Sequence, residues 1–264
     1  MTLIEPSSAG GHLAVRIKRA GDRRSLSRSA TRALDVLELF GRRRSPIRAM
    51  EIARELEMHP STTNQLLKTM VDSGHLVFNA RDKSYLPSQR LTEFAAWIGE
   101  AYGTGVRLRD LILQLQARTG MVVTVSTPND LFMQVVDLAV PDGMSAQRGL
   151  QVSLFGSAVG SAYLSMLEDS EIARLASRAR IPAPRIPKLF DEVAQIRREG
   201  HADGALEGSP YWSVAMPLPV QGLLVPTVLG LAGPADEVVA RLGELSQRMR
   251  EAITDWTGQP AIDR

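Results

Sequence analysis

The chain has 264 residues, of which 44% are hydrophobic, so it is long enough for one large domain or two smaller ones with buried cores. It contains no cysteine, which excludes disulfides and zinc–thiolate sites, and it lacks the run of about 18 apolar residues that a membrane helix needs. The net charge of +2 is unevenly spread: residues 1–90 carry 16 Lys and Arg against 9 Asp and Glu, whereas residues 91–264 carry 15 against 20. This asymmetry is typical of a nucleic-acid-binding module joined to a second domain, and we expect the protein in the cytoplasm.

The first segments of the chain predict a tail and two helices. Residues 1–24 mix Gly, Ser and Arg without apolar periodicity, which is typical of a flexible basic tail. Helical periodicity begins near Ser29, and Arg42-Arg43-Arg44 suits the C-terminal end of that helix. Residues 49–58, after a Ser-Pro turn, predict a short second helix. The expected buried face of the first helix consists of Ala30, Ala33, Leu34, Leu37 and Phe40.

The stretch from Ser61 to Gly74 predicts a helix with one apolar and one polar side. With the preceding helix it forms a helix-turn-helix pattern, whose second helix enters the major groove of DNA. Residues 76–87 predict a small hairpin with a basic tip, placed as a wing beside that helix. Residues 25–90 are therefore predicted to be a winged helix-turn-helix domain, with DNA contacts from Arg28, Arg32, Arg48, Ser61, Thr62, Thr63, Asn64, Gln65, Lys68, Arg81 and Lys83.

The rest of the chain predicts a linker and a second domain. Residues 91–105 predict a linker helix with aromatic side chains, which we expect to contact a second copy of the chain. Residues 106–264 contain β-rich runs at 121–126 and 131–136, which predict a hairpin, and further strands that follow a helical stretch. Strands on both sides of helices indicate a mixed sheet with helices packed on it, so the predicted fold class is α+β.

Short motifs occur in a definite order between residues 25 and 253. They are Glu51-Ile52-Ala53-Arg54-Glu55-Leu56, Ser61-Thr62-Thr63-Asn64-Gln65-Leu66-Leu67, Leu154-Phe155-Gly156-Ser157-Ala158-Val159-Gly160, Ser213-Val214-Ala215-Met216-Pro217 and Leu231-Ala232-Gly233-Pro234. In this order and spacing the chain resembles the isocitrate lyase regulator (IclR) family of bacterial transcription factors. The resemblance implies a winged helix-turn-helix, a GAF-like effector-binding and oligomerisation domain at 106–264, homodimers that pair as a dimer of dimers on operator DNA, and control by a small-molecule effector.

Departures from the family pattern carry information about what the protein binds. The family commonly has Arg where Gln65 stands, and Gln bonds an adenine edge bidentately where Arg prefers guanine, so the operator preference should differ. Arg48 replaces the usual polar N-cap of the second helix and is a weaker cap. In the second domain, Phe155 and Ser161 stand where His and Lys are frequent.

The resemblance also places three residues in the ligand site. Family members that bind small carboxylates share a Cys and two Ser, where this chain has Ser213, Gly230 and Ala232. A buried carboxylate needs several donors, so the loss of two hydroxyls predicts a larger, less polar and aromatic effector. The expected polar contacts come from Asp203, Ser213 and backbone N–H groups near Ala158 and Val159, and the expected apolar wall from Met121, Val123, Phe155, Trp212 and Met216.

Two other functions fit parts of the sequence. An enzyme is suggested by the Gly-x-Ser-x-Gly-like run at 156–160, but Ala158 occupies the nucleophile position. His201 and Asp203 share a strand face, yet a lone pair without further ligands is more often structural, so we expect no catalytic residue, no metal and no cofactor. A winged-helix adaptor that binds protein through the same surface is the second alternative.

Overall fold

The structure, a computed structural model, describes residues 17–18, 27–101, 108–144, 146, 148–206, 209–219, 223 and 225–258. The chain folds into two compact units. One unit is Arg23–Ala101, and the other combines Met1–Asp22 with Tyr102–Arg264. Of the predicted tail at 1–24, only Ile17–Lys18 is described, as the short strand β1, and the rest lies outside the described residues.

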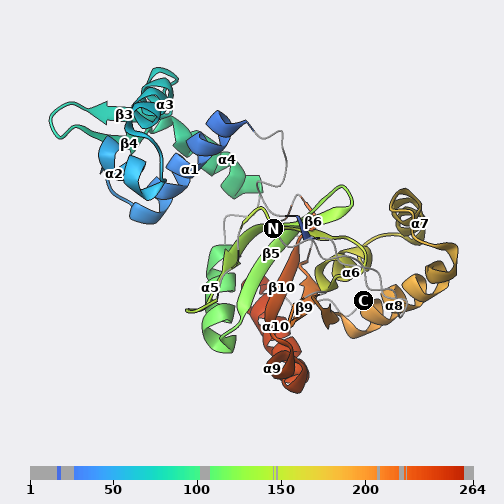
Figure 1. Ribbon diagram of the computed structural model, residues 1–264. Coiled ribbons are helices and arrows are strands. Elements are labelled where there is room, and N and C mark those ends of the chain that lie inside the picture. The colour runs from blue at the N-terminus through green and yellow to red at the C-terminus, as the bar shows by residue number, and fades with distance from the viewer. Residues whose placement is uncertain are drawn as a thin grey trace. The chain divides into compact units, whose positions relative to one another are not determined.

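The unit Arg23–Ala101 is a small α/β module built around three helices and a short sheet (Figure 1). Its elements in chain order are α1 (Arg28–Arg43), β2 (Ile47–Arg48), α2 (Ala49–Glu55), α3 (Pro60–Asp72), β3 (Leu76–Asn79), β4 (Ser84–Pro87) and α4 (Arg90–Ala101). The strands pair antiparallel in the order β2-β4-β3. This is the predicted winged helix-turn-helix, with the hairpin β3–β4 as the wing.

The core of this unit joins all three strands and helices α1 to α3. Val36, Leu39 and Phe40 of α1 pack against buried side chains of the other elements, among them Leu67 and Met70 of α3. The predicted buried face of α1 was partly wrong, because Leu34 is 62% exposed. The helix carries two overlapping apolar stripes, and packing against α3 decides which one is buried, a choice that periodicity within α1 does not reveal.

The second unit is built on a seven-stranded antiparallel sheet in the order β1-β7-β6-β5-β10-β9-β8 (Figure 1). Its further elements are α5 (Leu108–Thr119), β5 (Val122–Asn129), β6 (Phe132–Ala139), β7 (Gln151–Ser153), α6 (Ala158–Leu164), α7 (Asp169–Arg178), the 3-10 turn η1 (Ala183–Arg185), α8 (Ile186–Glu199), β8 (Ala202–Ala205), β9 (Tyr211–Pro217), β10 (Val228–Pro234), α9 (Ala235–Ala240) and α10 (Leu242–Thr257). A curled sheet with helices on both faces is a GAF-like fold, as predicted.

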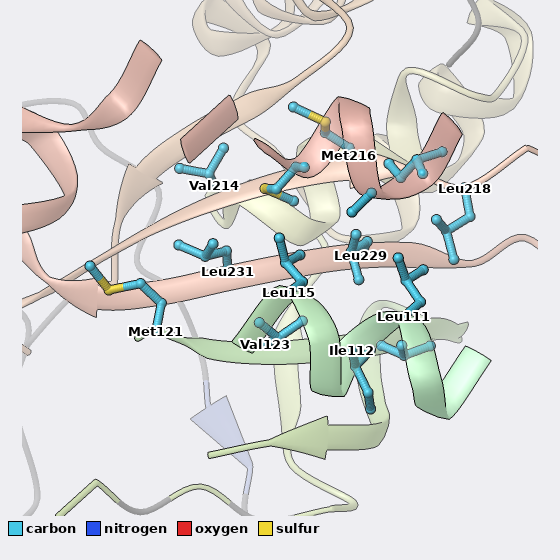
Figure 2. Close-up of a cluster of buried hydrophobic side chains, with 14 of the residues drawn as sticks. Leu111, Ile112, Leu115, Met121, Val123, Val214, Met216, Leu218, Leu229 and Leu231 are labelled. Atoms are coloured by element: carbon cyan, nitrogen blue, oxygen red, sulfur yellow. The ribbon is translucent and has the colours of Figure 1, made fainter. Parts of the chain in front are cut away.

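Each face of the sheet has its own core. On one face, the side chains of α5, α9 and α10 meet alternate residues of β5, β9 and β10, and Figure 2 shows Leu111, Ile112 and Leu115 of α5 among them. We call this the first core. On the opposite face, α6 lies directly on the strands, with buried side chains of α7 and α8 packed around it. We call this the second core.

Short elements and one helix break differ from the sequence expectation. The final helix, predicted over about 235–256, is two helices, because the backbone of Arg241 leaves the helical region at φ −110° and ψ 13°. Strands β2 and β7 were not predicted, since two or three residues are too few for an alternating pattern. Among the described residues, no helix combines the length and apolar character needed to cross a lipid bilayer.

Candidate nucleic-acid interface and ligand site

Helix α3 begins at a histidine cap. The backbone of His59 is extended, and its Nδ1 accepts a hydrogen bond from the backbone N–H of Ser61 at 3.4 Å and lies 2.8 Å from the Ser61 hydroxyl. Pro60 follows at a first-turn position, where the missing N–H costs nothing. The role of His59 as the cap was not predicted, because His is rarely used in this role.

The side of α3 that faces away from the core is polar and open. Ser61, Asn64, Gln65 and Lys68 are exposed, and their spacing of three and four residues places them on one face of the helix. Thr62, also predicted to contact DNA, is half-buried beside them. Amide, hydroxyl and ammonium groups in this arrangement can reach base edges or phosphates when the helix lies in a major groove.

Thr63 was wrongly included among the predicted DNA contacts. Its exposed fraction is 0%, and its hydroxyl donates to the backbone carbonyl of His59 at 3.2 Å. The residue therefore faces the core next to Leu67, one turn further along α3. Position on the helix wheel explains the error, since Thr63 is polar in type but lies on the buried side.

Six basic side chains of the unit Arg23–Ala101 have no acidic partner among the described residues. Within the part of the chain that the structure describes, none of Arg28, Arg32, Arg48, Lys68, Arg81 and Lys83 forms an ion pair with a carboxylate. Arg43, in contrast, is paired with Glu55. The hydrogen bond to Glu55 and its negative charge raise the pKa of Arg43 above its ordinary value. The unpaired cations remain available to phosphates.

The tip of the wing is held by its own polar contacts. Asn79 Nδ2 donates to Asp82 at 2.9 Å, and the backbone N–H of Arg81 donates to Asn79 Oδ1 at 3.0 Å. Lys83 then adopts the left-handed conformation at φ 53°, which returns the chain into β4. The side chains of Arg81 and Lys83 are both exposed at this turn.

The predicted ligand site in the second unit divides between the two faces of the sheet. Met121, Val123 and Met216 belong to the first core, where they are buried among side chains of the strands and of α5, α9 and α10 (Figure 2). Trp212 packs on the edge of the same core, and its Nε1 donates to the carboxylate of Asp203 at 2.9 Å. Strand alternation turns these five residues away from α6, so the predicted ligand residues do not all line one site.

The remaining predicted ligand residues meet between the sheet and α6. Phe155, Ala158 and Val159 lie in the second core. A Cβ atom at Gly230 would lie 3.1 Å from Val159, so Gly230 faces α6, and Ala232 follows on the same side of β10. Ser213 pairs with Ala232 across the strands, and its hydroxyl donates to the Gly204 carbonyl at 3.3 Å. These six residues form one layer, which we call the α6 layer.

The features that suggested an enzyme have structural roles. The hydroxyl of Ser157 caps α6, since it accepts from the N–H of Gly160 at 3.1 Å and donates to the Ser153 carbonyl at 2.7 Å. His201 Nδ1 lies 3.2 Å from the Glu199 carbonyl and 3.3 Å from Arg250. Among the described residues, no three or more His, Cys, Asp or Glu side chains lie together in a group that could hold a metal ion.

The chain is similar to known transcriptional regulators, in the first unit and over longer stretches. Residues 29–80 match the model of the IclR helix-turn-helix domain. The HTH-type transcriptional regulator XynR of Escherichia coli (strain K12) is 20% identical over 183 residues, which cover 66% of this chain and 73% of that protein. The HTH-type transcriptional regulator BhcR of Paracoccus denitrificans (strain Pd 1222) is 24% identical over 244 residues, or 86% of this chain and 85% of that protein.

Solved structures have the same fold over nearly the whole chain. The crystal structure of an IclR family transcriptional regulator from Brucella abortus is similar with a TM-score of 0.51 at 20% identity, covering 89% of this chain and 93% of that one. An IclR regulator from Alicyclobacillus acidocaldarius has a TM-score of 0.52 at 20% identity, with 88% of this chain and 96% of that one covered.

Proposed function

The chain belongs to the IclR family of transcriptional regulators, and on that premise we propose that it binds double-stranded operator DNA through α3 and the wing, under the control of a small-molecule effector. In this proposal α3 enters the major groove, with Ser61, Asn64 and Gln65 toward base edges. Lys68 and the unpaired arginines around it contact phosphates.

The observation that carries this function is the exposed polar face of α3. A helix that only stabilised its own domain would gain nothing from Asn64 and Gln65 pointing away from the core beside unpaired cations. Amide side chains can bond an adenine edge with two hydrogen bonds, and cations that displace counterions supply the affinity common to all sequences.

We propose that two copies of the chain pair through α4. Three large apolar side chains on this helix, Phe94, Trp97 and Ile98, are exposed, with Trp97 at 64%. Leu34 of α1, in the same unit, is also exposed. Clustered apolar residues of this size mark interaction sites, and a twofold pair of α3 helices would match a palindromic operator. A dimer of dimers on DNA extends the same proposal.

We propose that the effector binds in the α6 layer. Phe155, Ala158 and Val159 supply apolar surface and backbone N–H groups at the start of α6, and Ser213 supplies a hydroxyl. We propose an apolar or aromatic molecule rather than a small carboxylate, because Gly230 and Ala232 carry no donor.

Gel-shift binding with genomic fragments selected by the protein tests the DNA function. We expect preferred fragments to bind at least about 1,000-fold more tightly than random DNA of the same length, with affinity falling steeply as salt rises. Equal affinity for selected and random DNA would contradict the proposal.

Sedimentation of the Trp97→Asp variant tests the α4 interface. We expect Trp97→Asp to dissociate the dimer, whereas the control Arg54→Ala, at an exposed position of α2, should leave it intact.

One observation favours the alternative of a protein-binding adaptor. The wing exposes Val77, Phe78 and Leu86, which are larger apolar side chains than phosphate contact requires. The salt dependence of DNA binding separates the two functions, since an adaptor would show weak DNA binding without sequence preference.

A further inference from the structure

The α6 layer contains a hydroxyl that the family resemblance does not predict. A Cβ atom placed on Gly230 would lie 2.6 Å from Thr124 Oγ1 and 3.1 Å from Val159 Cγ1. Thr124 lies on β5, directly opposite Gly230 in the pairing of the two strands. The space that a serine side chain would take at position 230 is therefore occupied by the hydroxyl of Thr124, which comes from the neighbouring strand.

A second hydroxyl follows on the same side of β5. Ser126 lies two residues beyond Thr124 and pairs with Val228, which belongs to the second core. Its exposed fraction is 0%, and its Oγ has no hydrogen-bond partner among the described residues. An unpaired buried hydroxyl costs about 1–3 kcal/mol, so its retention inside an apolar core calls for a binding partner.

The strands and the helix that form the α6 layer carry no charged side chain. Strands β5, β9 and β10 and helix α6 contain no Asp, Glu, Lys, Arg or His. Asp203, the one acidic residue in the predicted ligand set, lies on the first-core face and bonds Trp212. An ionised ligand in this layer would meet no charged side chain on these four elements, so only hydroxyls and the backbone N–H groups at the start of α6 would offset the cost of its desolvation.

We propose that the effector is an uncharged molecule with an apolar body, whose hydroxyl, carbonyl or ester oxygen hydrogen-bonds to Thr124 and Ser126 of β5. In this proposal the hydroxyl donors lie on β5, whereas the resemblance puts those of carboxylate-binding family members at positions 230 and 232 on β10. This inference rests on the proposed function, since it concerns the ligand of the same α6 layer. It excludes aromatic acids, which the loss of the β10 hydroxyls alone would admit.

Thermal-shift measurements on the full chain with matched probes test this assignment. The probes are benzoate, methyl benzoate and benzyl alcohol, then phenylacetate with its methyl ester, and pyruvate and glyoxylate. We expect the neutral compounds to raise Tm and the carboxylates at the same concentration to leave it unchanged. Thr124→Val, which keeps the side-chain shape, should weaken the apparent affinity for the neutral compounds about 3- to 10-fold.

Matched variants keep the test interpretable. Thr127→Val makes the same change on the opposite side of β5 and should leave the Tm shifts as in the wild type. Gly230→Ser should abolish the shifts because Thr124 and Val159 block its side chain, whereas the double variant Thr124→Ala with Gly230→Ser should recover part of them.

Three results would overturn the inference: a shift from carboxylates alone, an apparent affinity for the neutral compounds that Thr124→Val leaves unchanged, or no shift from any neutral probe. Gel-shift binding with the same preparations reports on the regulator function separately. Operator binding that persists alongside any of these results would leave the proposed function standing and remove only the ligand assignment.

Discussion

Helices α3 and α6 begin in the same way and end up in opposite environments. Each starts at a side-chain cap, His59 for α3 and Ser157 for α6. Helix α3 buries one narrow side and leaves six polar side chains exposed, whereas α6 buries six of its seven residues between the sheet and the helices around it. Changes on the outer face of α3 should therefore alter DNA binding without altering stability, whereas changes in α6 should lower the stability of the second unit.

A glycine explains how α6 comes so close to the segment that follows β7. A Cβ atom at Gly160 would lie 2.0 Å from the carbonyl oxygen of Leu154, closer than any real contact. The helix therefore packs directly on the backbone that precedes it. The outer face of α3 needs no such close contact with the backbone, because it is exposed to solvent.

The largest effect on stability is expected from Gly160→Ala. The added methyl group must displace the Leu154 backbone, and we expect the free energy of unfolding to fall by about 3 kcal/mol, at the upper end for an overpacked site. Urea unfolding followed by circular dichroism measures the change. Gly243→Ala in α10 is the matched control: its Cβ meets nothing within 4 Å, so better helix propensity should raise stability by up to about 1 kcal/mol.

Gln65→Ala should give the complementary result on α3. We expect a loss of about 1–3 kcal/mol in binding to the preferred operator, with relaxed specificity and an unchanged free energy of unfolding. Gel-shift titrations on operator and random DNA measure both. Equal losses on the two DNAs would show that Gln65 contacts phosphate and reads no base, and Gln65→Arg should shift preference toward guanine.

Removing the cap of α3 should have a smaller effect on stability. His59→Ala deletes the acceptor for the Ser61 N–H, and we expect a loss of about 1 kcal/mol from the unit Arg23–Ala101. Thermal unfolding of the variant against His59→Asn, which restores a good capping acceptor, measures it. If Asn failed to recover stability relative to Ala, the cap would not be the cause.

Lys83→Ala on the wing should have the smallest effect. An exposed cation that touches one phosphate contributes under about 1 kcal/mol, so we expect all DNA sequences to bind slightly and equally less well. The slope of log affinity against log salt should fall by about 1. A loss confined to the operator would mean instead that the wing reads sequence.

Local pattern in the sequence was enough to predict the winged helix-turn-helix. Caps, turns and apolar periodicity coincide there within about 60 consecutive residues, so short-range rules apply. The long strands and helices of the second unit were predicted for the same reason. The buried side of α1, with Leu34 outside and Val36 inside, depends on packing against α3 and could not be read from α1 itself.

The ligand site was predicted less well, because its residues come from several strands. Met121, expected in the apolar wall, and Gly230, assigned by the family resemblance, were grouped in one site, yet they face opposite sides of the sheet. Thr124 and Ser126 had a visible signal, since they are polar and stand at alternate positions of the β-rich run 121–126. Only the strand pairing shows that they lie opposite Gly230 and Val228. Alternation assigns residues to a face, and tertiary pairing decides what that face meets.

The pairing of β1 with β7 bears on the order of folding. Ile17 lies opposite Val152 in this pair, so the beginning of the chain completes a sheet edge whose partner is made more than half a chain later. During synthesis the intervening unit Arg23–Ala101, which is built from neighbouring segments of the chain, can fold before β7 leaves the ribosome. The β1 segment can pair only after β7 has been synthesised. We therefore expect the pairing of β1 with β7, which closes this long loop, to be among the last steps in forming the sheet.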